Sequence, residues 1–135
     1  MSRIPFANAG TSAMSIEPPP SRAAVVAIAR RWIGTPYHHQ ASAEGAGCDC
    51  IGLVRGIWRE LYGAEPEPAP GYSRDWAEAT GEETLLAAAR RHFVEIAPSS
   101  ARPGDVLVFR YRAASLAKHA GLLASCGPAG ITFIH

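Results

Sequence analysis

Apolar residues recur at intervals of three and four along several stretches of the chain, the spacing that gathers side chains on one face of a helix. In the clearest stretch they are Leu53, Val54, Ile57, Trp58 and Leu61. Asp49 precedes this stretch and suits the N-cap of a helix, and Gly63 follows it as a stop signal. We therefore predict a helix whose first turn contains Cys50 and whose apolar stripe is buried.

The same spacing predicts two further helices. One follows the cap residue Ser21 and runs to about Ile33, with Gly34 closing it. The other runs from Glu82 to about Phe93, with acidic residues in its first turn and basic residues in its last, in agreement with the helix dipole. The apolar positions of these two helices are Val25, Ile28, Ala29, Trp32, Leu85, Leu86, Ala89 and Phe93.

The hydrophobic period changes after residue 102. Arg102–Asp105 has the composition of a turn, and the segments that follow it are rich in β-branched and aromatic residues. We expect strands over Val106–Tyr111, His119–Ser125 and Ile131–His135, with a turn over Cys126–Gly130 between the last two. Helices followed by an antiparallel meander predict an α+β domain.

Two stretches show no regular period. Residues 1–20 are rich in Ser, Ala, Gly and Pro and end in three consecutive prolines, so we expect a flexible N-terminal arm followed by one domain over residues 21–135. The apolar residues scattered along the arm leave open the alternative that it docks on a partner. Between Gly63 and Gly71 proline alternates with other residues, which favours an extended connection on the surface.

Composition agrees with a single domain that has an ordinary core, since 47% of the 135 residues are hydrophobic and 19% are charged. The formal net charge is +1, so electrostatics gives no argument for binding to nucleic acid or to an anionic membrane. No stretch has the roughly 18 consecutive apolar residues of a membrane span, and the N-terminus lacks a secretion signal. We expect a protein made in the cytoplasm without a membrane anchor, whose cysteines stay reduced or serve in chemistry.

Nucleophilic catalysis by cysteine needs a thiol, an imidazole that accepts its proton and a third group that orients the imidazole. Cys50 lies in the first turn of a predicted helix, where unpaired N–H groups and the helix dipole favour the thiolate, so we expect a lowered pKa. His119 opens one predicted strand and His135 ends the next. If these strands are neighbours in a sheet that packs on the helix, the two histidines lie side by side near the cysteine.

Each of these residues also has an ordinary structural interpretation. Cys50 could be an inert core cysteine, and a single histidine in a strand is more often structural than catalytic. A zinc site is disfavoured, because structural zinc sites usually present two pairs of closely spaced ligands and the chain offers one Cys-x-Cys pair. The remaining thiols and imidazoles are expected to be spare or solvated, except that a loop histidine could contact a substrate: Cys48, Cys126, His38 and His39.

Five motifs, taken together and in order, resemble the NlpC-type family of papain-like cell-wall cysteine peptidases. They are Gly34–Tyr37, Gly47–Val54, Pro103–Phe109, His119–Leu123 and Phe133–His135. The resemblance extends from about residue 22 to the end of the chain. It implies a papain-like fold in which N-terminal helices, one of them carrying the cysteine, pack on an antiparallel β-sheet. Relatives usually continue with further strands, so we expect C-terminal strands of the family to be missing here.

The resemblance also implies roles for four residues. Cys50 occupies the family's Asp-Cys-Ser-Gly position and would be the nucleophile, although Ile51 replaces the commoner serine. His119 would be the base, His135 would orient it, and Tyr37 would help to form the oxyanion site. The implied reaction hydrolyses an amide in the peptide stem of peptidoglycan, next to a D-γ-glutamyl or diaminopimelate residue, through a thioester acyl-enzyme. No metal or cofactor is implied.

The motif Thr-Pro-Tyr-x-His-Gln at residues 35–40 looks most similar to the phage tail and gene transfer agent branch of the family. It implies partners in a phage-like tail tip or baseplate, synthesis in the bacterial cytoplasm and action on the wall of a target cell. An insertion over about residues 64–80, which contains Trp76, would lie over the cleft or against a partner. Two alternatives stay open: a structural tail protein with weak or no activity, and an acyl transferase with the same thioester chemistry.

Overall fold

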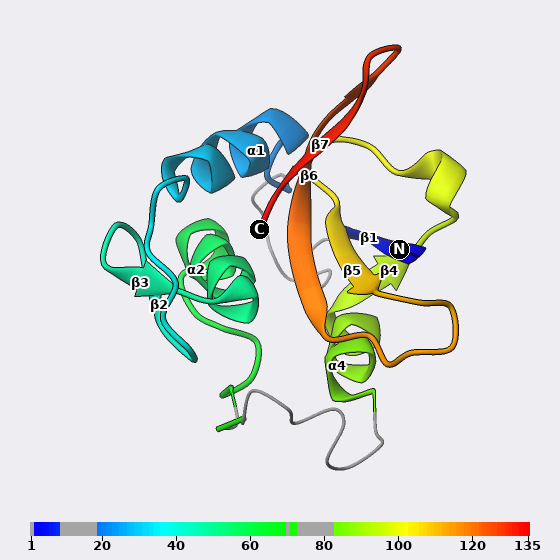
Figure 1. Cartoon of the computed structure of the whole chain (residues 1–135). Coiled ribbons are helices and arrows are strands. Elements are labelled where there is room, and N and C mark those ends of the chain that lie inside the picture. Colours follow the sequence, from blue (N-terminus) through cyan, green and yellow to red (C-terminus); the bar gives the residue numbers. More distant parts are fainter. Residues whose placement is uncertain (1, 9–18, 70, 73–82) are drawn as a thin grey trace.

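The structure of the chain, a computed structural model, describes residues 2–8, 19–69, 71–72 and 83–135 (Figure 1). Its elements in chain order are β1 (Ser2–Asn8), α1 (Arg22–Arg31), β2 (Ser42–Ala43), β3 (Gly47–Cys48), α2 (Cys50–Tyr62), α4 (Thr84–His92), β4 (Phe93–Glu95), a 3-10 turn (Pro98–Ser100), β5 (Val106–Arg110), β6 (His119–Gly127) and β7 (Gly130–Ile134). Trp76 and the rest of residues 73–82 lie outside the described part of the chain, as do residues 9–18.

Five of the described strands form one antiparallel sheet in the order β4-β1-β5-β6-β7 (Figure 1). Because side chains alternate between the two faces of a strand, β5 sends Val106 and Val108 to one face and Leu107 and Phe109 to the other. Each face carries its own cluster of buried apolar residues. The register of the sheet pairs Phe109 with His119, which places the histidine at the start of β6 on the second face.

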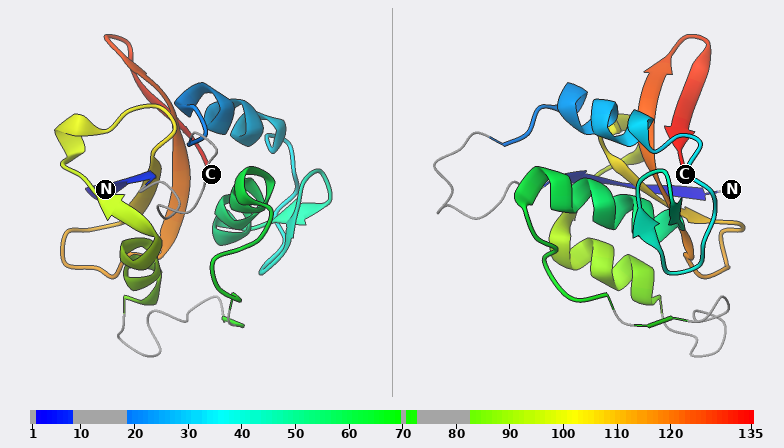
Figure 2. Two further views of the ribbon diagram at one scale, coloured as in Figure 1. Left: turned by 180° about the vertical axis from the view of Figure 1, so that it is seen from behind. Right: turned by 90° about the vertical axis from the view of Figure 1, so that its left-hand side faces the viewer.

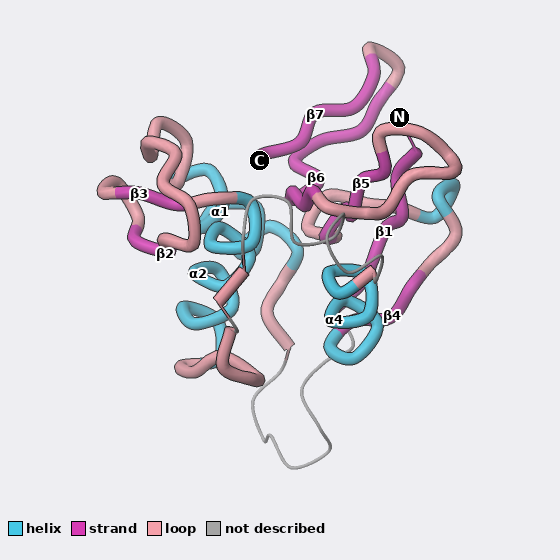
Figure 3. The backbone as a smooth tube through the Cα atoms, turned by 60° about the horizontal axis from the view of Figure 1, so that its bottom comes forward, coloured by secondary structure: helices cyan, strands magenta, loops and turns pink. Residues whose placement is uncertain are grey.

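The helices cover the first face of the sheet, where their apolar stripes join the main core (Figure 2). Leu53 and Ile57 of α2 and Leu86 of α4 are buried there against the strands. Gly56 lets α1 and α2 approach closely, since a Cβ atom at this position would lie 2.1 Å from the ring of Trp32. The small β2–β3 ribbon lies beside the helices, away from the large sheet (Figure 3). An α+β fold with helices packed on an antiparallel sheet is therefore confirmed.

Both predicted helix caps are confirmed. The Ser21 hydroxyl accepts the N–H of Ala24 at 3.1 Å, and the Asp49 carboxylate accepts the N–H of Gly52 at 2.7 Å. The observed bounds of α1 and of the last three strands differ from the predicted bounds by at most two residues. Glu82, the predicted first residue of α4, is outside the described residues. The helix is described from Thr84.

The prediction of a flexible arm is wrong for Ser2–Asn8. These residues form β1, which lies between β4 and β5 within the sheet, and the side chain of Phe6 is completely buried (0% exposed). Local composition misled the prediction, because β1 obtains its hydrogen bonds and its burial from strands about a hundred residues later in the chain. The strand fills a central position that a sheet built from the later strands alone would leave open.

Within the described ranges, no helix combines the length and the hydropathy that a membrane-spanning segment requires. The longest, α2, has 13 residues.

We expect Phe6→Ala to lower the free energy of unfolding by about 3 kcal/mol, because the substitution leaves a cavity in the centre of the core. Urea denaturation followed by circular dichroism measures the change. Arg3→Ala on the same strand is the control, since its side chain is exposed and the change should stay within about 0.5 kcal/mol. Equal stability of the Phe6→Ala variant and the parent would contradict the placement of β1 in the sheet.

Candidate active site

The start of α2 is held by the buried carboxylate of Asp49. One oxygen accepts the N–H of Gly52 at 2.7 Å, and the other accepts the N–H of Gln40 at 2.7 Å. Glycine is required at position 52, because a Cβ atom there would lie 1.8 Å from the carbonyl oxygen of Ala41. The loop before β2 therefore wraps tightly around the first turn of the helix, and Cys50 is fixed at the point where loop and helix meet.

Cys50 faces a cavity of about 310 Å³. The structure places all four predicted site residues on the wall of this cavity, although they come from four separate places in the chain: Tyr37, Cys50, His119 and His135. The other lining residues are Thr35, His39, Cys48, Asp49, Ile51, Tyr72 and Lys118. The location agrees with the predicted site, and the individual catalytic roles stay predictions.

The two predicted histidines form a pair. Nε2 of His119 lies 3.0 Å from Nδ1 of His135, and the rings meet edge to face with centroids 5.0 Å apart. Gly121 permits this approach of β7 to β6, since a Cβ atom there would lie 2.8 Å from the carbonyl oxygen of Ile134 and 3.2 Å from Cβ of His135. When Nε2–H of His119 donates to His135, Nδ1 of His119 is free to accept a proton.

Two phenylalanine rings pack against the histidine pair. The ring of Phe109 lies 5.6 Å from that of His119, and the ring of Phe133 lies 5.1 Å from that of His135. Phe109 and Phe133 are themselves 4.8 Å apart. The four rings form one cluster of tilted and edge-to-face contacts, so the orientation of both imidazoles is set by packing as well as by their hydrogen bond.

Burial raises the pKa of the Cys50 thiol above its ordinary value. A hydrogen bond with the backbone of Ala120 opposes this change, while the negative charge of Asp49 adds to it. The expectation of a lowered pKa is therefore wrong, because desolvation outweighs the favourable helix start. Burial, and then the neighbouring His135, lower the pKa of His119. Both directions favour a neutral thiol beside a neutral imidazole at rest.

Tyr37 lies at the mouth of the cavity with 62% of its surface exposed. Its backbone is fixed by the neighbouring residues, since the N–H of His38 donates to the carbonyl of Cys48 at 3.0 Å and the N–H of Cys48 donates to the carbonyl of Pro36 at 3.0 Å. The phenol is thus presented on a rigid segment beside the strand that leads into Cys50. This location suits the predicted contact with an oxyanion.

Sequence reasoning missed Tyr72, which belongs to the predicted insertion. Its hydroxyl donates to Asp49 at 2.5 Å, and its carbonyl accepts a hydrogen bond from Nε2 of His39 at 2.7 Å and another from the side chain of Gln40. Burial and the bond to Asp49 raise the pKa of Tyr72. His39 was expected to be a solvated loop residue, but its side chain instead binds the backbone of Tyr72. The one available signal for Tyr72 was its position directly after the proline-rich run, and this position does not indicate that its hydroxyl binds Asp49.

The other two thiols differ in location. Cys48 lines the cavity, and burial raises its pKa, whereas Cys126 is exposed near the far end of β6. Among the described residues, no group of three or more His, Cys, Asp and Glu side chains is arranged to hold a metal ion.

A helix that begins at a cysteine, packed on an antiparallel sheet whose histidine lines the same cavity, defines the papain-like class of fold. The chain belongs to the NlpC/P60 family, whose model matches residues 34–134. It is similar to the gamma-DL-glutamyl hydrolase of Bacillus subtilis (strain 168), with 29% identity over 119 residues, which cover 87% of this chain. Those residues cover 25% of the relative, so the chain spans about a quarter of its length. No solved structure matches the chain significantly.

The family predicted from the five motifs is thereby confirmed. Neither comparison bears on the phage tail and gene transfer agent branch, which stays a prediction.

We expect alkylation of Cys50 by iodoacetamide to rise with pH and to reach half its maximal rate above the ordinary cysteine pKa of about 8.5. Peptide mass spectrometry resolves the rate at each cysteine, and the exposed Cys126 reports the reagent's activity in the same sample. A midpoint below pH 7 for Cys50 would mean that a thiolate and an imidazolium already exist at rest, against the neutral pair described above.

Proposed function

We propose that this chain is a cysteine peptidase that hydrolyses amide bonds in the peptide stem of peptidoglycan. The observation that carries the proposal is the single cavity that joins Cys50 to the His119–His135 pair. Membership of the NlpC/P60 family and the similarity to a hydrolase support a cell-wall hydrolase of the peptidase type. The relative's name specifies a γ-glutamyl bond, and we propose the same class of bond, next to a D-γ-glutamyl or diaminopimelate residue.

In the proposed reaction, Nδ1 of His119 accepts the proton of Cys50 as the sulfur attacks the carbonyl carbon of the amide. The C–N bond breaks, the leaving nitrogen takes that proton, and the acyl group stays on the sulfur as a thioester. A water molecule then gives a proton to His119 and attacks the thioester. The C–S bond breaks, which releases a carboxylic acid and restores the thiol. The Tyr37 hydroxyl donates to the oxygen that becomes negative in both steps.

A neutral Cys50 thiol beside a neutral His119 imidazole at rest fits this general-base route. A His119 with a lowered pKa is neutral at pH 7, so its Nδ1 can accept a proton. A Cys50 with a raised pKa still carries its proton, and transfer to His119 accompanies the attack. His135 accepts Nε2–H of His119 and so holds the neutral imidazole in the tautomer that leaves Nδ1 open to a proton.

We further propose that the chain works as part of a phage-like tail tip or baseplate, made in the bacterial cytoplasm and acting on the wall of the target cell. The motif at residues 35–40, which resembles the phage tail and gene transfer agent branch of the family, supports this proposal. Its protein partners would be tail or baseplate components.

Cys50→Ala should abolish release of stem-peptide products from peptidoglycan fragments while the domain stays folded, and Cys48→Ala should keep most of the activity. Mass spectrometry of the products reads the result and identifies the bond, and circular dichroism checks the fold. Equal loss in the two variants would count against Cys50 as the nucleophile. A folded parent with no cleavage would favour the alternative of a structural tail protein.

Variants of His135 test whether this residue orients the imidazole of His119 or only contributes to the stability of the fold. His135→Ala should lower kcat roughly 10- to 100-fold with little change in KM, and His135→Asn should restore part of it because the amide oxygen can accept Nε2–H of His119. Both variants remove an influence that lowers the pKa of His119, so the acid limb of kcat/KM should move to higher pH. An acid limb that stays in place would show that His135 does not act through His119.

A further inference from the structure

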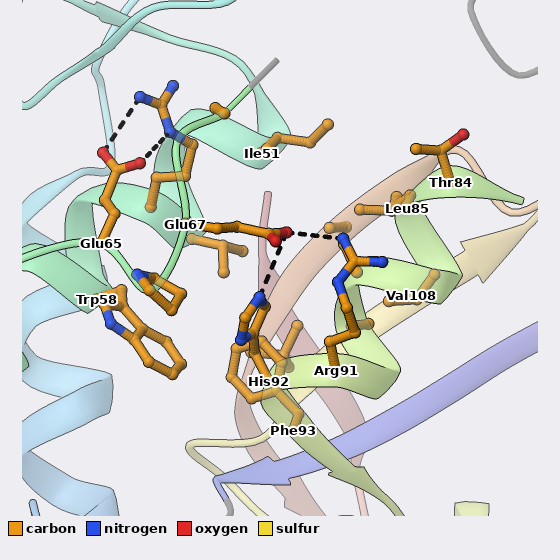
Figure 4. Close-up of a pocket in the computed structure, with 18 of the residues that line it drawn as sticks. Ile51, Trp58, Glu65, Glu67, Thr84, Leu85, Arg91, His92, Phe93 and Val108 are labelled. Carbon is orange, nitrogen blue, oxygen red and sulfur yellow. Dashed lines mark hydrogen bonds and ion pairs between the residues drawn. The ribbon is translucent and has the colours of Figure 1, made fainter. Parts of the chain in front are cut away.

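A second cavity, of about 180 Å³, lies between α2 and α4 (Figure 4). Its floor is formed by the sheet, from Val106 and Val108 of β5 and Ala120 of β6. The extended segment Glu65–Ala69 crosses its outer side. The wall is almost entirely apolar, and the cavity is larger than the roughly 150 Å³ that accommodates benzene in a protein interior.

The charged groups at the rim of this pocket are paired with one another. Glu65 bonds to Arg55 at 3.0 Å, and Glu67 bonds to Arg91 at 2.7 Å and lies 3.3 Å from His92 (Figure 4). Arg55 and Arg91 lower the pKa values of Glu65 and Glu67, so both glutamates are ionised at neutral pH. The segment between them is thereby tied to α2 on one side and to α4 on the other. Such a rim offers no unbalanced charge to attract a charged ligand.

The pocket adjoins the candidate catalytic cavity. Ile51 and Tyr72 line both, and Ile51 is the residue directly after Cys50. Ala120 belongs to the pocket floor, and its backbone is hydrogen-bonded to the Cys50 thiol. The pocket and the catalytic cavity are therefore neighbours around the first turn of α2, beside Cys50.

The pocket is elongated along the helices. Its wall on α2 runs from Ile51 to Trp58, which is two helical turns or about 10 Å. On α4 the wall runs from Thr84 to His92. Figure 4 shows Ile51 toward one end of the pocket and Phe93 toward the other. A single methyl group, such as that of an alanine residue, would leave most of this space empty.

We propose that this pocket binds a straight aliphatic chain carried by the acyl group that is transferred to Cys50. The proposal rests on the proposed nucleophile and extends its substrates to esters and amides of medium-chain carboxylic acids. Cys50 attacks the acyl carbonyl, the bond to the alcohol or amine breaks, and the leaving group takes the proton held by His119. Water then hydrolyses the thioester to the free carboxylic acid and the thiol. The aliphatic chain stays in the pocket throughout both steps.

Binding is measured first in a Cys50→Ala background, where turnover does not interfere. Calorimetry compares acetamide with hexanamide as neutral probes. Each buried methylene is worth about fourfold in affinity, so hexanamide should bind at least tenfold more tightly. Ala88→Leu, which fills the pocket from α4, should remove that difference. Ala87→Leu on the exposed face of the same helix is the matched control and should preserve it. Equal binding of the two amides would overturn the proposal.

Turnover is measured next in the chain with Cys50 present. Hydrolysis of p-nitrophenyl esters from acetate to hexanoate should show kcat/KM rising at least tenfold with chain length, and Ala88→Leu should flatten this rise while Ala87→Leu keeps it. A flat profile in the parent would overturn acyl-chain selection. If no ester reacts, the proposed nucleophile fails. Tighter binding of hexanamide in the first assay would then still support the pocket, and its absence would reject it.

Discussion

The buried carboxylate of Asp49 is the interaction on which the arrangement of the site depends. It accepts hydrogen bonds from the first turn of α2, from the loop that precedes β2 and from the phenol of Tyr72. A buried anion is tolerated only when its oxygens are satisfied, and here three donors and the start of a helix satisfy them. The charge fixes Cys50 in space, and it also contributes to the raised pKa of that thiol.

The sheet supplies the other half of the site through its register. Because Phe109 is paired with His119 and Leu122 with Ile134, the end of β7 brings His135 beside the start of β6. The absence of a side chain at Gly121 makes this approach possible. Strands β5 and β6 also form the floor of the apolar pocket. One scaffold thus serves both the reacting atoms and the proposed binding of an aliphatic chain.

Sequence patterns predicted the elements whose signals are local. Ser21 and Asp49 cap the helices as expected, and the positions of Cys50, His119 and His135 around one cavity agree with the motifs. The failures concern long-range effects. Strand β1 acquires its burial from β4 and β5, and the pKa of Cys50 is set by desolvation in the folded protein. The bond between Tyr72 and Asp49 joins residues 23 positions apart, which no local pattern reveals.

The most direct test of the account is to trap the acyl-enzyme. Acid quenching during turnover of a peptidoglycan fragment, followed by proteolysis and peptide mass spectrometry, locates any covalent intermediate. We expect an acyl group of the stem peptide on the peptide that contains Cys50, and none on Cys48 or Cys126. Product formation without any adduct on Cys50, or with the adduct on another residue, would contradict the assignment of Cys50 as the nucleophile.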